Sequence, residues 1–392
     1  MSAEERQWFG NVPTSWTIGK MRSVVYERRE KFNRNEELII LSLLKDVGVI
    51  PYSEKGDIGN KSKDDHTQYK VARKGDLVIN SMNVIIGSVG ISPYDGYISP
   101  AYYSFAPRAN TCMGFVGYLC STRKFQKAVR CYAKGIMEIR LRVSSYDFLS
   151  MPIPLPPLPE QKAIVAYLDV ETGRIDKAIA AEEKMIALLQ ERREIVINEA
   201  VGSGEMRKGW KVKPWNGIFA NLDYLRKPIT ADQRPRANPQ YDYYGASGVI
   251  DKIDYYNVDD TVLLIAEDGA NLVLRNLPLV YKAKGKVWIN NHAHILKPRV
   301  DNYDFLSYLL ESYDYTTLIT GSAQPKLSQG QLATIRLAIP PLPEQEEIVK
   351  RLDAETGKID RAIEVKRRQI ELLRERRQIV IDEAVTGKVK VA

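Results

Sequence analysis

The chain has 392 residues, with 57 Lys and Arg against 49 Asp and Glu, a formal net charge of +8 and a pI near 9.1. This length suffices for two domains of ordinary size plus connecting helices, and the excess of basic residues is compatible with a phosphate-binding surface without requiring one. The sequence has no run of eighteen apolar residues and no apolar segment of signal-peptide length. We therefore expect a cytoplasmic protein and exclude a membrane-spanning or exported one.

Residues 1–151 are predicted to form a first domain of mixed α/β structure. Strand-like runs bounded by Gly, Asn and Asp occur at 76–80 and 84–86, and a helical pattern covers 122–132. The three cysteines, Cys112, Cys120 and Cys131, lack metal-binding spacing, and their odd number argues against a disulfide framework. We expect reduced thiols and no metal site.

Residues 152–206 open with a proline-rich boundary and contain the first copy of a long repeat. Pro-Pro-Leu-Pro-Glu-Gln at Pro156–Gln161 returns at Pro340–Gln345, and a gapless alignment of Pro156–Val201 with Pro340–Val385 has 29 identities in 46 positions. A repeat of this length indicates an internal duplication about a pseudo-twofold axis rather than a solenoid.

Each copy of the repeat predicts one long helix. Pro159 and Pro343 suit a first helical turn, and apolar residues then recur in alternating steps of three and four, as in a coiled coil. About forty residues make a rod of roughly 60 Å, which needs a partner helix to cover its apolar stripe. We expect the two copies to pair antiparallel. Glu182-Glu183-Lys184 facing Lys366-Arg367-Arg368 would favour pairing within the chain over homodimers, although the sequence does not fix the register; the alternative is that each helix packs only on its own domain. The predicted seam consists of Leu168, Ile175, Ile179, Ile186, Leu189, Val196, Leu352, Ile359, Ile363, Ile370, Leu373 and Val380.

Residues 207–339 are predicted to form a second mixed α/β domain, followed by the second repeat at 340–392. Strand-like runs occur at 261–266 and 287–289, and a helical pattern covers 303–312. This block shows no comparable identity to residues 1–150, so the two blocks are expected to perform different versions of one task. Trp16 with Ile18, and Trp210 with Val212, precede the first core segment of each block and are interpreted as packing anchors rather than base stackers.

Two variable blocks separated by duplicated Pro-Pro-Leu-Pro-Glu-Gln helices resemble the specificity subunit of type I restriction-modification enzymes. The resemblance covers the whole chain. Its further matches are phrases typical of target-recognition domains, at 74–80, 95–102, 243–248, 266–270, 290–294 and 320–328.

The resemblance implies a fold of two α/β (α+β) target-recognition domains joined by two long antiparallel coiled-coil helices. It also implies a non-catalytic subunit that reads an asymmetric bipartite site in double-stranded DNA, one half-site per variable block. The paired helices would fix the spacer and dock two modification (methyltransferase) subunits, with restriction/translocase subunits joining through the assembled complex. S-adenosylmethionine, ATP and Mg are then expected on the partner subunits and no cofactor on this chain.

Amide, hydroxyl, imidazole and basic groups in loops are the candidates for DNA contact, because paired hydrogen bonds from such groups read base edges and phosphates. Asn80, Ser81 and Asn83 follow a strand and equally suit turn caps, while the histidine pair near 292 could instead bind a metal but lacks a third ligand. The basic residues near Tyr241, Tyr243 and Tyr244 suit phosphate contact or a solvated loop. The full set is Asn80, Ser81, Asn83, Arg140, Arg142, Arg226, Lys227, Arg234, Arg236, Asn290, Asn291, His292, His294, Gln324 and Lys326.

Two other classes of protein would require different sequence features. An amino-methyltransferase would carry an Asp/Asn-Pro-Pro-Tyr/Phe tetrapeptide and a glycine-rich cofactor loop, and a translocase a G-x-x-x-x-G-K-[ST] loop; the sequence has none of these. A coiled-coil protein-interaction scaffold without sequence-specific DNA binding is the remaining alternative.

Overall fold

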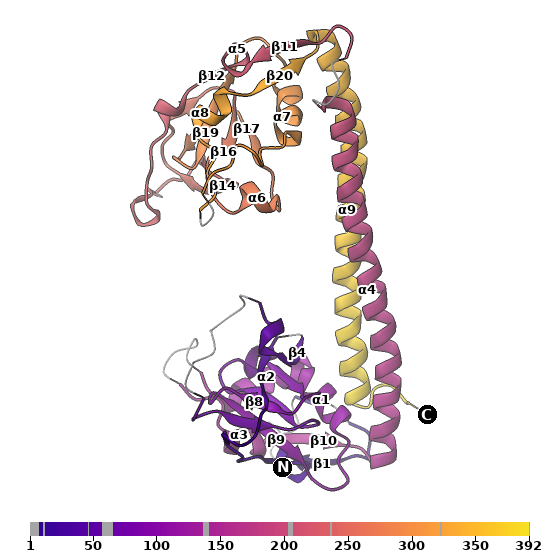
Figure 1. The fold of residues 1–392 in the computed structure, drawn as a ribbon. Coiled ribbons are helices and arrows are strands. Elements are labelled where there is room, and N and C mark those ends of the chain that lie inside the picture. Colours follow the sequence, from indigo (N-terminus) through magenta and orange to yellow (C-terminus); the bar gives the residue numbers. More distant parts are fainter. Residues whose placement is uncertain are drawn as a thin grey trace. The chain divides into compact units, whose positions relative to one another are not determined.

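The computed structural model describes residues 8–10, 12–45, 47–56, 66–135, 141–202, 207–235, 237–321 and 324–391. The chain divides into two compact units, residues 1–183 with 368–392 and residues 184–367. Each unit contains one variable block together with part of both long helices (Figure 1).

The first block is built on two four-stranded sheets. One has the order β2-β9-β6-β7 and is antiparallel throughout, and the other has the order β4-β3-β8-β5 with β3 parallel to β8. The strands are β1 (Thr17–Lys20), β2 (Val25–Glu27), β3 (Ile39–Leu44), β4 (Gly48–Pro51), β5 (Lys70–Ala72), β6 (Leu77–Asn80), β7 (Val89–Ile91), β8 (Gly96–Ile98), β9 (Tyr102–Pro107) and β10 (Pro152–Leu155). The helices are α1 (Met113–Ser121), α2 (Arg123–Tyr132), α3 (Ser145–Ser150) and the short 3-10 turns η2 (Met21–Ser23), η3 (Tyr52–Glu54) and η4 (Val84–Ile86).

The second block repeats this topology without repeating its sequence. Its sheets have the orders β12-β19-β16-β17 and β14-β13-β18-β15, with β13 parallel to β18, and β11 pairs with β20 as β1 pairs with β10. The strands are β11 (Lys211–Pro214), β12 (Phe219–Asn221), β13 (Tyr241–Gly245), β14 (Gly248–Ile253), β15 (Val258–Asp259), β16 (Val262–Ala266), β17 (Val280–Ala283), β18 (Lys286–Ile289), β19 (Ala293–Pro298) and β20 (Arg336–Ile339). The helices are α5 (Trp215–Ile218), α6 (Asn271–Leu274), α7 (Tyr303–Ser312), α8 (Gln329–Ala333), η6 (Asp223–Leu225) and η7 (Ala231–Gln233).

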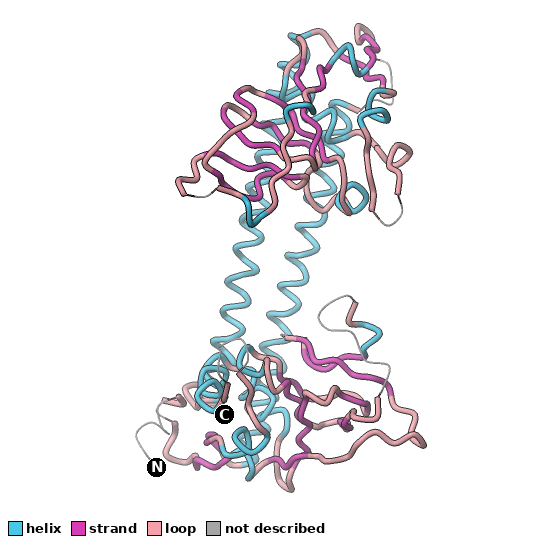
Figure 2. The backbone as a smooth tube through the Cα atoms, turned by 90° about the vertical axis from the view of Figure 1, so that its left-hand side faces the viewer, coloured by secondary structure: helices cyan, strands magenta, loops and turns pink. Residues whose placement is uncertain are grey.

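The two repeats form α4 (Leu158–Val201) and α9 (Leu342–Val385), which run side by side in opposite directions (Figures 1 and 2). In one unit Arg377 pairs with Asp176 at 2.8 Å, and in the other Arg193 pairs with Asp360 at 3.0 Å. The second ion pair is the first with the two copies exchanged, which antiparallel pairing of duplicated helices requires. The predicted pairing of the repeat helices is confirmed.

The twelve seam residues all lie in the covered faces of α4 and α9. Leu168 and Leu352 are fully buried, and Ile175, Val196, Ile363 and Ile370 are each less than 9 % exposed. The remaining six are half-buried, whereas Leu188 and Leu372, which lie outside the seam, are 48 % and 49 % exposed. The apolar stripe of each helix is therefore covered in part by the other helix and in part, near its ends, by the variable blocks.

Most of the predicted elements are present, with two differences. The run 84–86 was expected to be a strand but forms the 3-10 turn η4, closed by Gly87 at φ +97°; periodicity cannot separate a three-residue apolar strand from a buried turn. Glu183 pairs with Arg374 at 3.1 Å, a partner outside the cationic stretch 366–368.

The three cysteines are free thiols: Cys120 is buried, Cys112 half-buried and Cys131 exposed. Burial raises the pKa of the Cys120 thiol well above its ordinary value. In the described part of the chain, no helix is long and apolar enough to cross a membrane.

Candidate nucleic-acid interface

The repeated Glu-Gln dipeptide holds each variable block to the start of its helix. Trp16 Nε1 donates to Glu160 Oε1 at 3.0 Å, and Trp210 Nε1 donates to Glu344 Oε1 at 2.8 Å. Both indoles are 6 % exposed, as expected of packing anchors, and Ile18 is half-buried, whereas Val212 is 46 % exposed and does not serve as an anchor.

The glutamine of the same dipeptide satisfies the backbone on both sides of the helix start. The Gln345 side chain accepts from the Asn302 N–H at 2.8 Å and donates to the Pro340 carbonyl at 3.0 Å. Gln161 makes the matching bonds to the Cys112 N–H and the Pro156 carbonyl. The repeated motif therefore supplies the same attachment to two blocks of different sequence.

A second matched attachment lies about two to three helical turns further along. The Tyr118 hydroxyl of α1 donates to Asp169 at 2.7 Å and lies 3.2 Å from the Thr172 hydroxyl. Tyr308 of α7 makes the same contacts with Asp353 and Thr356, at 2.8 and 3.3 Å. Each block is thus fixed on its helix at two points, which leaves its opposite loops as the variable surface.

Those loops form a matched rim in each block. The loops follow β6 and β8 in the first block and β16 and β18 in the second. We define the first rim as residues 81–83, 99–101 and 142, and the second rim as residues 267–269, 290–292, 324 and 326. The Ser81 N–H donates to the Ala101 carbonyl at 3.2 Å, and the Glu267 N–H donates to the His292 carbonyl at 2.9 Å. The carbonyls of Ser81 and Glu267 accept in turn from Val143 and Leu327, so Ser81 and Glu267 occupy equivalent positions in the two rims.

The predicted DNA-contact residues in and beside the first rim are of two kinds: buried side chains that support the loop, and exposed side chains. Asn80 and Ser81 are each 6 % exposed, and Asn80 Oδ1 accepts the Met82 N–H at 3.0 Å, which fixes the turn. Asn83 and Arg142 are exposed. Arg140 lies outside the described residues.

The second rim shows the same separation. Asn290 is 4 % exposed, and its Oδ1 accepts the His292 N–H at 2.8 Å. His294 is 1 % exposed, with Nδ1 2.6 Å from Asp223 and Nε2 2.8 Å from the Leu327 carbonyl, so both ring nitrogens are occupied inside the block. Asn291 and His292 are exposed.

Ion pairs organise the second rim. Arg226 pairs with Glu267 and Asp223, and Lys326 pairs with Glu267 at 3.1 Å. Burial, the largest single influence, would raise the pKa of Glu267, but the interactions with Arg226, His294 and Lys326 together outweigh it and the pKa is lowered. His292 Nδ1 lies 2.9 Å from the Asp268 carboxylate. Lys227, Gln324 and Lys326 are exposed.

Two of the predicted basic residues belong to another part of the second block. Arg234 packs over the Tyr243 ring at 4.3 Å and pairs with Asp251 at 3.0 Å, so its guanidinium supports the β13–β14 hairpin. Arg236 lies outside the described residues. Among the described residues, no group of three or more potential ligands could hold a metal ion.

Sequence reasoning missed Glu267 and Asp268 as members of the second rim. They directly follow the fully buried strand β16, and a polar turn after such a strand was the available signal. Their partners Arg226 and Lys326 are distant in sequence, which only the fold reveals.

The two rims differ in chemistry although their backbones match. The polar side chains of the first rim are one amide, two hydroxyl groups and one arginine, and those of the second are three amides, two carboxylates, an imidazole and one lysine. Amides pair with adenine edges and carboxylates accept from the cytosine amino group, so equivalent surfaces with these side chains suit different base sequences.

The architecture is thus two blocks of one topology, each attached to the start of one copy of a duplicated helix. The family model described as "Type I restriction modification DNA specificity domain" matches the chain twice, at residues 24–190 and 207–373. The chain belongs to this family.

Individual relatives agree with the family match. A Haemophilus influenzae protein named provisionally as a type I restriction enzyme specificity subunit is 35 % identical over 147 residues, 37 % of each chain. The type I restriction enzyme MjaVIII specificity subunit of Methanocaldococcus jannaschii is 26 % identical over 277 residues, 62 % of this chain and 63 % of the relative. The matched region thus spans less than two thirds of these relatives.

A solved structure reported for complex assembly and conformational transition of the type I R-M system has the same fold. It superposes with a TM-score of 0.72 at 16 % identity, covering 97 % of this chain and 100 % of the other.

Proposed function

We propose that this chain is the DNA-recognition subunit of a type I restriction-modification enzyme. The observation that carries the proposal is the pair of equivalent rims with unlike side chains. Matched backbones supply the same approach to DNA, and unlike side chains supply two different half-sites, so the target is an asymmetric bipartite sequence.

Residues 1–151 and 207–339 are assigned to the two half-sites, and residues 152–206 and 340–392 to joining and spacing them. Half-sites on one face of B-DNA lie about 34 to 36 Å or a multiple apart, and a stiff helix pair fixes such a span better than a flexible linker. The exposed faces of α4 and α9 then dock two modification subunits.

Catalysis belongs to the partner chains in this account. Methyl transfer from S-adenosylmethionine and ATP-driven, Mg-dependent cleavage take place on modification and restriction subunits, and the whole complex acts on DNA in the cytoplasm. Among the candidate DNA contacts, the exposed residues Asn83, Arg142, Lys227, Asn291, His292, Gln324 and Lys326 touch DNA, while buried Asn80, Ser81, Asn290 and His294 hold the rims in shape.

The experiment is to co-express the chain with its methyltransferase partner and sequence host DNA for methylated adenines. An asymmetric motif of two half-sites around an unread spacer is expected. A stable complex that leaves no sequence-dependent methylation would instead indicate a protein-interaction scaffold.

A further inference from the structure

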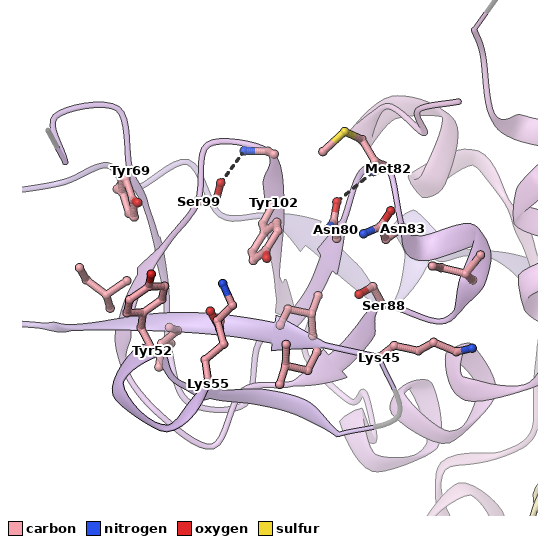
Figure 3. A pocket seen from close by; sticks show the side chains of 17 residues that line it. Lys45, Tyr52, Lys55, Tyr69, Asn80, Met82, Asn83, Ser88, Ser99 and Tyr102 are labelled. Carbon is pink, nitrogen blue, oxygen red and sulfur yellow. Dashed lines mark hydrogen bonds between the residues drawn. The ribbon is translucent and has the colours of Figure 1, made fainter. Parts of the chain in front are cut away.

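A cavity of about 380 Å³ lies in the first block beside the first rim. It is bounded by strand β3 and η3 on one side and by the ends of β6 and β9 on the other (Figure 3). A space of this size has the volume of a small-ligand site and cannot admit a duplex.

The cavity has aromatic and polar walls. The rings of Tyr52, Tyr69 and Tyr102 surround it, and the ammonium group of Lys55 lies among them, 5.0 Å from the Tyr52 ring centroid (Figure 3). Lys55 is only 8 % exposed.

Hydrogen-bond donors also line the cavity from the rim side. Asn80 uses its Oδ1 to accept the Met82 N–H, which leaves its Nδ2 as a donor beside Ser88 and Ser99. Burial raises the pKa of Tyr102, so this phenol stays neutral. Lys55 and Asn80 together favour a ligand edge rich in acceptors.

The cavity arises from small side chains that are specific to the first block. Ser99 Oγ accepts the Ala101 N–H, and in the second block Asn290 Oδ1 accepts the His292 N–H in the same way. Ser99 therefore corresponds to Asn290, and Ala101 corresponds to His292. Ser99 and Ala101 line the cavity, whereas the larger Asn290 packs its amide against Gly245 of β13. At these two positions the first block therefore has smaller side chains than the second.

We propose that this cavity takes up one unstacked nucleotide of the half-site bound by the first block. The inference rests on the proposed function. Tyrosine rings replace the lost base stacking, and Lys55 with the Asn80 amide donates to acceptor atoms such as guanine O6 and N7 or thymine O4. Drawing a base out of the duplex costs unpairing and unstacking energy, and contacts in the cavity offset it.

The test is mismatch scanning of the first half-site with the complete methyltransferase complex. Duplexes carrying the methylation motif receive one mismatch at each position in turn. At one position other than the methylated adenine, the mismatch should tighten binding about tenfold, because the base is already unpaired. Lys55→Gln should abolish this gain, and the control Lys127→Gln, on the exposed side of α2, should retain it.

Three results would overturn the proposal: no position with a gain, an equal gain in Lys55→Gln, or a uniform loss of affinity for every duplex, which would assign Lys55 to a phosphate. Should Lys55→Gln fail to assemble, Tyr52→Leu removes one ring of the cavity and provides the same comparison. Wild-type binding without any sequence preference would refute the proposed function itself, which separates the two failures.

Discussion

Trp210 and Glu344 are joined by a 2.8 Å hydrogen bond from the indole Nε1 to the carboxylate, and Trp16 and Glu160 repeat it at 3.0 Å. Each bond links the first strand region of a variable block to the first turn of the helix that follows the block. Because the glutamate is part of the duplicated motif while the blocks diverge, this bond explains why Glu160 and Glu344 are identical in the two copies.

Trp16→Phe and Trp210→Phe keep most of the buried ring but remove its N–H donor. Each should lower the free energy of unfolding of its own unit by about 1.5 to 3 kcal/mol, as for hydrogen bonds to charged groups. Calorimetry or urea unfolding measures the change. Trp8→Phe is the matched control, because the buried Trp8 Nε1 has no hydrogen-bond partner among the described residues; an equal loss in all three variants would contradict the account.

Truncating a leucine of α9 to alanine should lower the free energy of unfolding by an amount that depends on whether the side chain lies in the seam. Leu352 is fully buried and Leu372 is 49 % exposed on the same helix. Leu352→Ala should cost about 2 to 5 kcal/mol of unfolding free energy, whereas Leu372→Ala should cost well under 1 kcal/mol. Equal destabilisation, measured by urea unfolding, would mean that the apolar stripe is not the packing face.

The second rim should weaken in acid. Burial would raise the pKa of Asp223, but bonds from His294 and the Ile295 N–H outweigh it and the pKa is lowered. A lowered carboxyl pKa contributes stability that is present above about pH 4 and is lost as the pH falls through the folded-state value. Asp223→Asn should therefore reduce the free energy of unfolding at pH 7, and its difference from wild type should shrink below pH 4.

Urea unfolding between pH 7 and pH 2 measures this difference. Asp259→Asn, at an exposed position of β15, is the control and should follow the wild-type curve. A difference between Asp223→Asn and wild type that stays constant with pH would show that the carboxylate charge does not stabilise the rim.

The helix pair predicts the spacing of the half-sites. Deleting one heptad from each helix, residues 180–186 and 367–373, keeps them opposite one another in the register of the Arg193–Asp360 and Arg377–Asp176 pairs. The helices shorten by about 10 Å, so the methylated motif should lose about three base pairs of spacer. Deletion from α4 alone breaks the register and should abolish methylation; an unchanged spacer in the double deletion would exclude the helices as the ruler.

The sequence predicts the duplicated helices well because the apolar seam and the Pro-Pro-Leu-Pro-Glu-Gln motif are both repeated in the two copies. It could not reveal that the variable blocks share one topology, since that similarity resides in backbone pairing such as β6 with β9 and β16 with β19. Nor could it separate Asn80 from Asn83, or Asn290 from Asn291, because burial of one neighbour and exposure of the other depends on loops distant in sequence. The cavity around Lys55 likewise combines strands that only the fold brings together.

The most direct measurement is a methylome comparison of Asn83→Ala and Asn291→Ala, each co-expressed with the methyltransferase partner. Both side chains are exposed on equivalent rims, so each substitution should relax base preference in a different half-site, by about 1 to 3 kcal/mol of discrimination, and leave the other half-site intact. Relaxation of the same half-site by both variants, or an unchanged motif in both, would contradict the assignment of one half-site to each block.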